Sequence, residues 1–135
     1  MKFGAAIAAV LLALFCFIAP AQAANMEQLQ QLKDQNLCVH CDLQNADLAS
    51  ANLRGTNLKG SDLRGANLSD ALMMAVNLKE ADLRGANLDN AYVQVVDLTG
   101  ANLKGASVDN VNFRALRLCH TTLPNGKVSN RDCGS

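Results

Sequence analysis

Cysteine and histidine are the residue types in this chain best suited to covalent or metal chemistry. Beyond the first 23 residues they are Cys38, His40, Cys41, Cys119, His120 and Cys133. The first three form a CxxC motif with a histidine inside it, and the last three lie near the C-terminus. Thiols and imidazoles at such spacings occur in disulfides, zinc sites and thiol-disulfide exchange. Haem attachment is excluded at the CxxC, because Asp42 stands where that motif requires histidine.

The first 23 residues have the pattern of a secretory signal. Lys2 gives a positive start, an apolar run follows, and residues 20–23 (PAQA) end in the small-x-small pattern that signal peptidase accepts. A membrane anchor is the alternative, but the apolar run is shorter than the ~20 residues of a span. Cleavage after Ala23 removes Cys16 and leaves four cysteines. An even number in an exported chain indicates disulfides.

The exported part, residues 24–135, is nearly neutral. The whole chain has 12 Lys and Arg residues against 12 Asp and Glu residues, so the loss of Lys2 leaves a net charge of −1. Nucleic-acid binders are usually basic and DNA mimics strongly acidic, so the charge favours neither class. We therefore predict no nucleic-acid partner, and no stable membrane insertion once the signal is removed.

A five-residue repeat occupies most of the exported sequence. Fifteen consecutive units run without an insertion from Cys41 to Ala115, each with an apolar residue at its third position. These central residues are Leu43, Leu48, Leu53, Leu58, Leu63, Leu68, Met73, Leu78, Leu83, Leu88, Val93, Leu98, Leu103, Val108 and Phe113. The register continues to Leu118 and Leu123. Such self-similarity indicates a repeat architecture.

A period of five fits neither common element. Five residues of an α-helix turn through about 500°, so the leucines would spiral around every side. In a flat strand successive side chains point to opposite faces, so an odd period would place successive leucines on opposite faces. A chain that bends once per unit instead returns every leucine to the inside. Position five is Gly or Asn in nine of the 15 units, and these residues tolerate the positive φ of a tight turn. We expect another turn type in the remaining units, which carry Ser50, Asp70, Ala75, Glu80, Val95 and Ala115 there.

The A-(D/N)-L-x-x units resemble those of the pentapeptide-repeat family over residues 41–123. The resemblance implies an all-β solenoid, a right-handed quadrilateral β-helix of about four coils stacked at strand spacing, ~4.8 Å. Four pentads would form each coil, with positions one and three inside and the others outside. The CxxC and the cysteine-containing tail resemble exported members from photosynthetic bacteria and plant thylakoid lumens, which implies the periplasm or the thylakoid lumen.

The residues and the resemblance together set the expected organisation. Residues 1–23 are the signal peptide, 24–40 a capping helix and linker, 41–123 the β-helix, and 124–135 a capping tail. Asn25 has the character of a helix N-cap. We expect a short amphipathic helix over residues 25–35 to cover the open end of the solenoid. The residues proposed for its apolar stripe are Met26, Leu29, and Leu32 or Leu37.

The coil arrangement that the resemblance implies limits which cysteines can lie close together. Cys41 would open the first coil and Cys119 would end the fourth, too far apart for one zinc ion with ~2.3 Å metal-sulfur bonds. We therefore expect Cys38 to pair with Cys41 and Cys119 with Cys133, and we predict no metal and no cofactor. A redox role for the CxxC is the alternative, but Cys41 would face inward, where its thiol is shielded.

Residues 20 apart would share one wall of the solenoid. One wall combines Asp42, Asp62 and Asp82 with Arg64, Arg84 and Lys104, a self-neutralising surface. The next carries Asp47, Asp70, Asp89 and Asp109, which suit either solubility or a cationic partner. A third wall has mainly apolar residues where polar ones are usual, and these candidates for a partner surface are Leu72, Met74, Tyr92, Gln94 and Val95.

The sequence indicates no catalytic site. His40 and His120 are the only histidines, and no Ser-His-acid or paired-carboxylate arrangement can be placed. We predict a non-enzymatic, exported structural or protein-binding scaffold that contacts a partner, or itself, through the apolar wall. A thiol-disulfide or metal-handling protein is the alternative. The resemblance also admits a DNA-mimic protein that protects gyrase, but the neutral charge and the signal pattern oppose that role.

Overall fold

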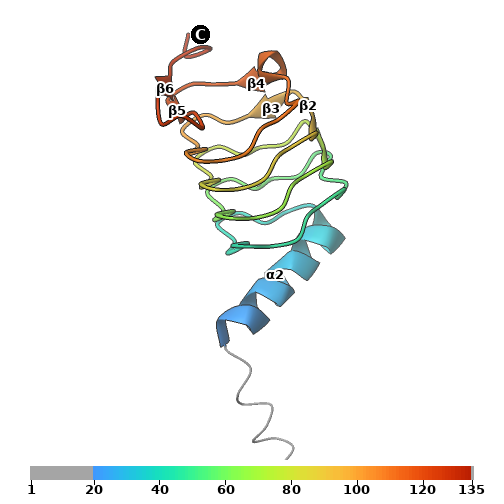
Figure 1. Cartoon of the computed structure of the whole chain (residues 1–135). Coiled ribbons are helices and arrows are strands. Elements are labelled where there is room, and N and C mark those ends of the chain that lie inside the picture. Colours follow the sequence, from blue (N-terminus) through green and yellow to red (C-terminus); the bar gives the residue numbers. More distant parts are fainter. Residues whose placement is uncertain (1–19, 135) are drawn as a thin grey trace, which may run out of the picture.

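The computed structural model describes residues 20–134. The predicted signal peptide therefore lies mostly outside the described residues, and helix α2 (Pro20–Gln35) is the first element. Residues 37–122 wind into a four-sided stack of coils above this helix (Figure 1). Within the described residues no helix is both long and apolar enough to cross a membrane.

Each coil contains 20 residues. Parallel bridges join residues 20 apart on every wall, and one column runs through Leu37, Asn57, Asn77, Asp97 and Arg117. That column makes four successive steps of one coil each. The prediction of four pentads per coil is confirmed.

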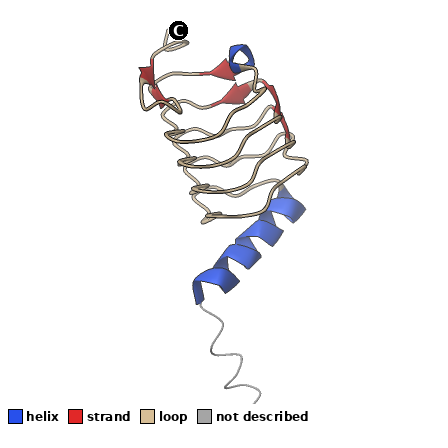
Figure 2. Cartoon of the chain, viewed as in Figure 1, coloured by secondary structure: helices blue, strands red, loops and turns tan. Residues whose placement is uncertain are grey.

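Regular strands are short, and most of the stack is drawn as loop (Figure 2). A pentad bends once per side, so only two or three residues of each side are straight enough for a strand. The parallel pairs are β1 (Leu72–Met74) with β2 (Tyr92–Gln94), and β3 (Val96–Asp97) with β4 (Leu116–Arg117). Near the C-terminus a 3₁₀ turn, η1 (Phe113–Ala115), precedes the antiparallel pair β5 (Thr121–Thr122) and β6 (Val128–Ser129).

The core is an aliphatic column at the centre of the stack. Position three supplies its large side chains, such as Leu63 and Leu83, which are both 0% exposed. Position one supplies small residues between them, such as Ala66 and Ala81. Full burial of one leucine stabilises a fold by roughly 1.5–3 kcal/mol relative to its exposed state. The repeated leucines therefore supply the main driving force for coiling.

Position two stabilises the bend. Its Asp or Asn Oδ1 accepts a hydrogen bond from the backbone N–H two residues later, at 2.9–3.3 Å. The acceptors are Asp42, Asp47, Asn52, Asn57, Asp62, Asn67, Asn77, Asp82, Asn87, Asp97, Asn102 and Asn112. Asp and Asn side chains favour such turns. This local bond explains why the repeat prefers these residues.

Position five has positive φ in all pentads from 41 to 110, whatever its residue type. Ser50, Asp70, Ala75, Glu80 and Val95 have φ values of 55–59°. The expectation of another turn type at these five positions was wrong. The bond network between coils imposes the same bend on each, as with Ser50 N–H donating to Ser69 O at 2.8 Å. It does so despite a cost of roughly 1–2 kcal/mol for a side chain in this conformation.

Ala115 is the exception among the fifteen units. It ends the 3₁₀ turn η1 and is absent from the residues with positive φ. The pentad at 111–115 therefore does not complete a regular side of the stack, and the last coil is irregular at this corner.

Helix α2 covers the end of the first coil with fewer apolar side chains than the sequence predicts. Leu32 is 1% exposed and Leu29 packs against the core, but Met26 is 72% exposed and Leu37 44% exposed. The predicted stripe was therefore wrong for Met26, and of the two alternatives Leu32 and Leu37 it is Leu32 that is buried. The helix begins at Pro20, so Asn25 lies inside it and not at its N-cap. Proline suits a first helical position, because its missing N–H has no helical partner there.

Thr56 is the one buried polar side chain without a partner in the described part of the chain. It is 1% exposed and its Oγ1 makes no hydrogen bond, whereas the buried Thr121 Oγ1 donates to Leu98 O at 2.7 Å. We expect Thr56→Val to raise the free energy of unfolding by about 1 kcal/mol, because an unpaired buried hydroxyl is destabilising. Urea unfolding measures this change. Thr121→Val is the control and is expected to destabilise; a destabilised Thr56→Val would contradict the prediction.

Candidate functional site

A charged wall runs along one side of the stack. Arg64 pairs with Asp62 at 2.6 Å and reaches Asp82 of the next coil at 3.8 Å. Arg84 pairs with Asp82 at 2.6 Å. Opposite charges thus alternate along the wall and neutralise one another within it. This arrangement leaves little net charge there for a charged ligand.

These pairs predict the acid sensitivity of the fold. Hydrogen bonds from Arg64 hold the pKa of Asp62 below its ordinary value of 3.8, and those from Arg84 do the same for the pKa of Asp82. A lowered folded-state pKa contributes stability above the unfolded-state value, and this contribution is lost as the pH falls through the folded-state value. We expect the free energy of unfolding to fall below about pH 4, and less steeply in Arg84→Gln. Urea unfolding at several pH values tests this; equal slopes in both proteins would contradict it.

The predicted apolar surface comes together on one wall. The name apolar patch is used for Leu72, Met74, Tyr92, Gln94 and Val95. Leu72 lies opposite Tyr92, and Met74 opposite Gln94, in the parallel pair of β1 and β2. Tyr92 is 55% exposed and Val95 73% exposed, while Leu72 and Met74 are half-buried.

The apolar patch interrupts the repeated turn bond. Leu72 and Tyr92 occupy position two, so their pentads lack the carboxylate or amide acceptor that most other pentads use. Val95 has φ 55°, a genuine outlier for a β-branched residue. Residues that suit the local fold poorly, yet gather in register and stay partly or fully exposed, need an explanation other than folding.

Two hollows lie beside the apolar patch, and Ala115 of turn η1 lines both. One, of about 320 Å³, is lined by patch residues Tyr92 and Gln94 together with Asn110 and Asn112. The other, of about 400 Å³, includes Val95 and Arg114. Sequence reasoning missed these polar neighbours, because it treated 111–115 as a regular pentad. Position five carried no signal that this unit differs, because Ala75 occupies the same position in a pentad with the regular positive φ.

The cysteines form two bonded pairs at opposite ends of the stack. Sγ of Cys38 is 2.00 Å from Sγ of Cys41, and Sγ of Cys119 is 2.15 Å from Sγ of Cys133. The first pair is buried, with Cys38 0% and Cys41 7% exposed. Such burial opposes thiol exchange at the CxxC, as expected for an inward-facing motif.

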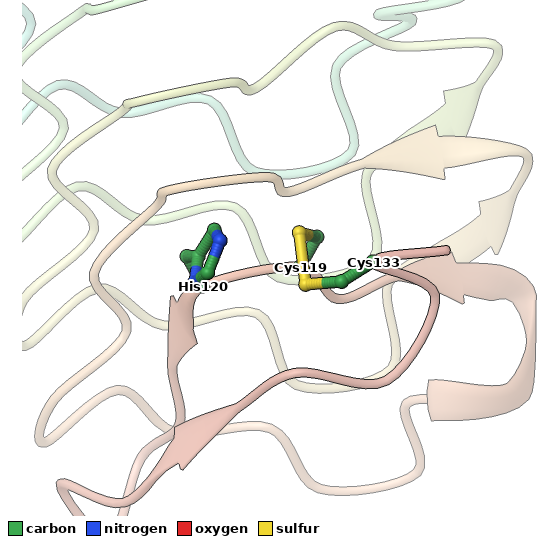
Figure 3. Close-up of side chains that lie close together, drawn as sticks. All are labelled: Cys119, His120 and Cys133. Carbon is green, nitrogen blue, oxygen red and sulfur yellow. A yellow bond between two sulfur atoms is a disulfide. The ribbon is translucent and has the colours of Figure 1, made fainter. Parts of the chain in front are cut away.

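The second pair has a histidine beside it. A ligand atom of His120 and the sulfurs of Cys119 and Cys133 all lie within 4.8 Å of one another (Figure 3). As zinc ligands, these residues had been considered from the sequence only in combination with the distant CxxC. The structure instead gathers three potential ligands at the C-terminal end alone.

Comparisons with known proteins describe the same repeat. A family model for pentapeptide repeats matches residues 41–79 and 77–114. No curated protein matches the chain at the sequence level.

Solved structures share the stacked-coil fold. The chain is similar to HetL, a pentapeptide repeat protein involved in heterocyst differentiation regulation in the cyanobacterium Nostoc sp. strain PCC 7120 (30% identity, TM-score 0.67). That match covers 69% of this chain but only 43% of HetL, so this chain spans less than half of that protein. A pentapeptide repeat protein from the Arabidopsis thaliana thylakoid lumen is 32% identical with a TM-score of 0.51, over 73% of this chain and 72% of that one.

Proposed function

This chain belongs to the pentapeptide-repeat family, and on that premise we propose that it is a non-enzymatic, exported scaffold that presents the apolar patch to a protein partner. Its fold is the right-handed quadrilateral β-helix, with a short N-terminal α-helix. A stack of short, mutually bonded coils keeps the patch in one geometry before binding. Preorganisation of this kind lowers the entropic cost of binding.

One observation carries the proposal. At Leu72 and Tyr92, facing each other on adjacent coils, the chain gives up the turn bond that Asp or Asn supplies in most other pentads. Val95 adds a side chain poorly suited to its backbone conformation. These three positions combine a poorer fit to the local fold with apolar side chains that are half-buried at Leu72 and exposed at Tyr92 and Val95, as a contact site requires.

The surroundings of the patch suit a protein partner. Arg54 and Arg114 are exposed and occupy position four of the pentads one coil before and one coil after the patch. Tyr, Met and Arg are enriched in protein interfaces, where an apolar centre is surrounded by a polar rim. The expected partner therefore offers an apolar anchor flanked by acidic groups.

We place this scaffold in the periplasm or the thylakoid lumen. The signal-like start of the sequence supports an exported location. The likeness to a protein of the Arabidopsis thylakoid lumen supports the same conclusion. Two disulfide-bonded pairs also suit an oxidising compartment.

Site-specific photo-crosslinking tests the proposal. A photo-reactive residue is placed at position 92 in the full chain expressed in its own host. Positions 87 and 102, which are close in sequence but lie on other walls, serve as controls. We expect a discrete protein adduct from position 92 and none from the controls. An adduct that joins two copies of this chain would identify the contact as self-association. Equal labelling from all three positions, or none from position 92, would contradict the proposal.

A further inference from the structure

We propose that the C-terminal cysteine pair, once reduced, forms a zinc(II) site with His120. The ligands are the two thiolates of Cys119 and Cys133 and one imidazole nitrogen of His120. This site is separate from the apolar patch and does not depend on the partner contact. It gives the scaffold a second, redox-controlled state at its C-terminal end.

The positions of the three ligand atoms suit one ion. Zn–S bonds of ~2.3 Å and Zn–N bonds of ~2.1 Å place the ligands of a tetrahedral zinc roughly 3.5–3.8 Å apart. The three atoms already lie within 4.8 Å of one another, so small side-chain rotations bring them to these distances. Two cysteines and one histidine leave a fourth position for water, a ligand set that zinc accepts.

The tail is held in place by bonds other than the disulfide. Asp132, next to Cys133, accepts a hydrogen bond from the backbone N–H of Leu118, next to Cys119, at 3.1 Å. The Arg131 guanidinium donates to the carbonyl oxygens of Phe113 at 2.7 Å and Leu116 at 2.5 Å. The pairing of β5 with β6 adds backbone bonds. Reduction therefore leaves the two thiols close together.

The two ends of the stack differ in accessibility. His120 and Cys133 are exposed, and no hydrogen bond to the His120 ring is present among residues 20–134. At the other end the disulfide is buried, and the His40 ring lies over Gly60, where an added Cβ would clash with it. A mild reductant in solution therefore reaches the C-terminal pair first, and its imidazole is free to bind.

The chemistry balances with a dithiol as reductant. The dithiol gives two electrons and two protons to the Cys119–Cys133 bond, which becomes two thiols while the dithiol becomes a disulfide. Zinc(II) then displaces the two thiol protons, because the thiolates are the ligands. Bound zinc keeps the sulfurs from re-forming the disulfide until it is removed.

Cobalt(II), a spectroscopic substitute for zinc, provides the test. The mature chain is treated with dithiol until two thiols per chain titrate, the reductant is removed under anaerobic conditions, and cobalt(II) is added. We expect one cobalt(II) per chain with thiolate-to-metal charge-transfer absorption, and its loss on addition of zinc(II). The oxidised chain is expected to give no such absorption.

Matched variants assign the ligands. Cys133→Ser is expected to remove most of the charge-transfer absorption. His120→Ala is expected to weaken cobalt(II) binding at least about tenfold, because loss of a residue that only hydrogen-bonds to a metal ligand already lowers metal affinity by that factor. His40→Ala, at the other end, is expected to bind as the wild type does. Circular dichroism confirms that each variant is folded. Absence of cobalt binding by the reduced wild type, or unchanged binding in Cys133→Ser or His120→Ala, would overturn the proposal.

Discussion

Leu63→Ala is expected to lower the free energy of unfolding by about 2–5 kcal/mol. Leu63 is 0% exposed and sits in the middle of the aliphatic column, with Leu43 and Leu83 at the same position one coil away on either side. Truncation leaves a cavity that the stacked coils cannot collapse to fill, because backbone bonds on all four walls fix their spacing. Urea unfolding of the purified chain, followed by circular dichroism, measures the loss.

The control for this prediction is Leu123→Ala. Leu123 has the same residue type at the same pentad position, but it lies at the end of the stack and is only partly buried. We expect its loss of stability to be clearly smaller than that of Leu63→Ala. Similar losses at both positions would mean that burial in a continuous column does not determine the stability of this fold.

Tyr92→Arg and Leu72→Asp are each expected to weaken partner binding at least about 30-fold, the effect of losing an interface residue that contributes 2 kcal/mol or more. Each change places a charge in the apolar centre of the patch, where the partner would have to desolvate it. Both side chains point outward from the core, so the fold is expected to persist. The affinity of each purified variant for the captured partner measures the effect.

A matched variant separates charge from position. Asn102→Arg introduces the same charge at position two of the charged wall, away from the patch. It is expected to bind the partner as the wild type does. Unchanged affinity in Tyr92→Arg, with all proteins folded by circular dichroism, would end the proposed role of the patch.

The period of five was sufficient to predict a chain that bends once per pentad and turns its leucines inward. The four-sided coil and its walls came from the resemblance to the pentapeptide-repeat family. It placed Leu72 and Tyr92 on one wall, and the register of β1 and β2 confirms that placement. It did not reveal the turn bond from position two, although the repeated Asp and Asn residues were its signal. A local hydrogen bond is recognisable only once the bend that it stabilises is known.

The ends of the stack were harder to predict, because the repeat no longer constrains them. No sequence pattern explains why Met26 is exposed, since its spacing from Leu29 and Leu32 fits a helical stripe. Among the side chains of helix α2 that the structure describes, Leu29 and Leu32 are the apolar ones that contact the core. At the other end, Ala115 and the tail fold according to tertiary contacts, such as those of Arg131, that no short pattern encodes.

Position five shows how tertiary structure overrides local preference. Val95 and Glu80 adopt the same positive φ as the glycines at equivalent positions. Residue type alone favours another turn for them. The hydrogen bonds and packed leucines of adjacent coils fix the bend at every corner, so a single unsuitable residue is tolerated there. Such tolerance allows the outer surface to change without loss of the fold.

The most direct test is Tyr92→Asn, measured for both stability and binding in the same protein. Asparagine restores the side-chain acceptor that most other pentads use, so we expect the free energy of unfolding to stay level or rise by about 0.5–1.5 kcal/mol. Capture of the partner by a photo-reactive residue at position 74 is expected to disappear. If the variant instead loses stability and still captures the partner, Tyr92 serves the fold, and the apolar patch is not a docking surface.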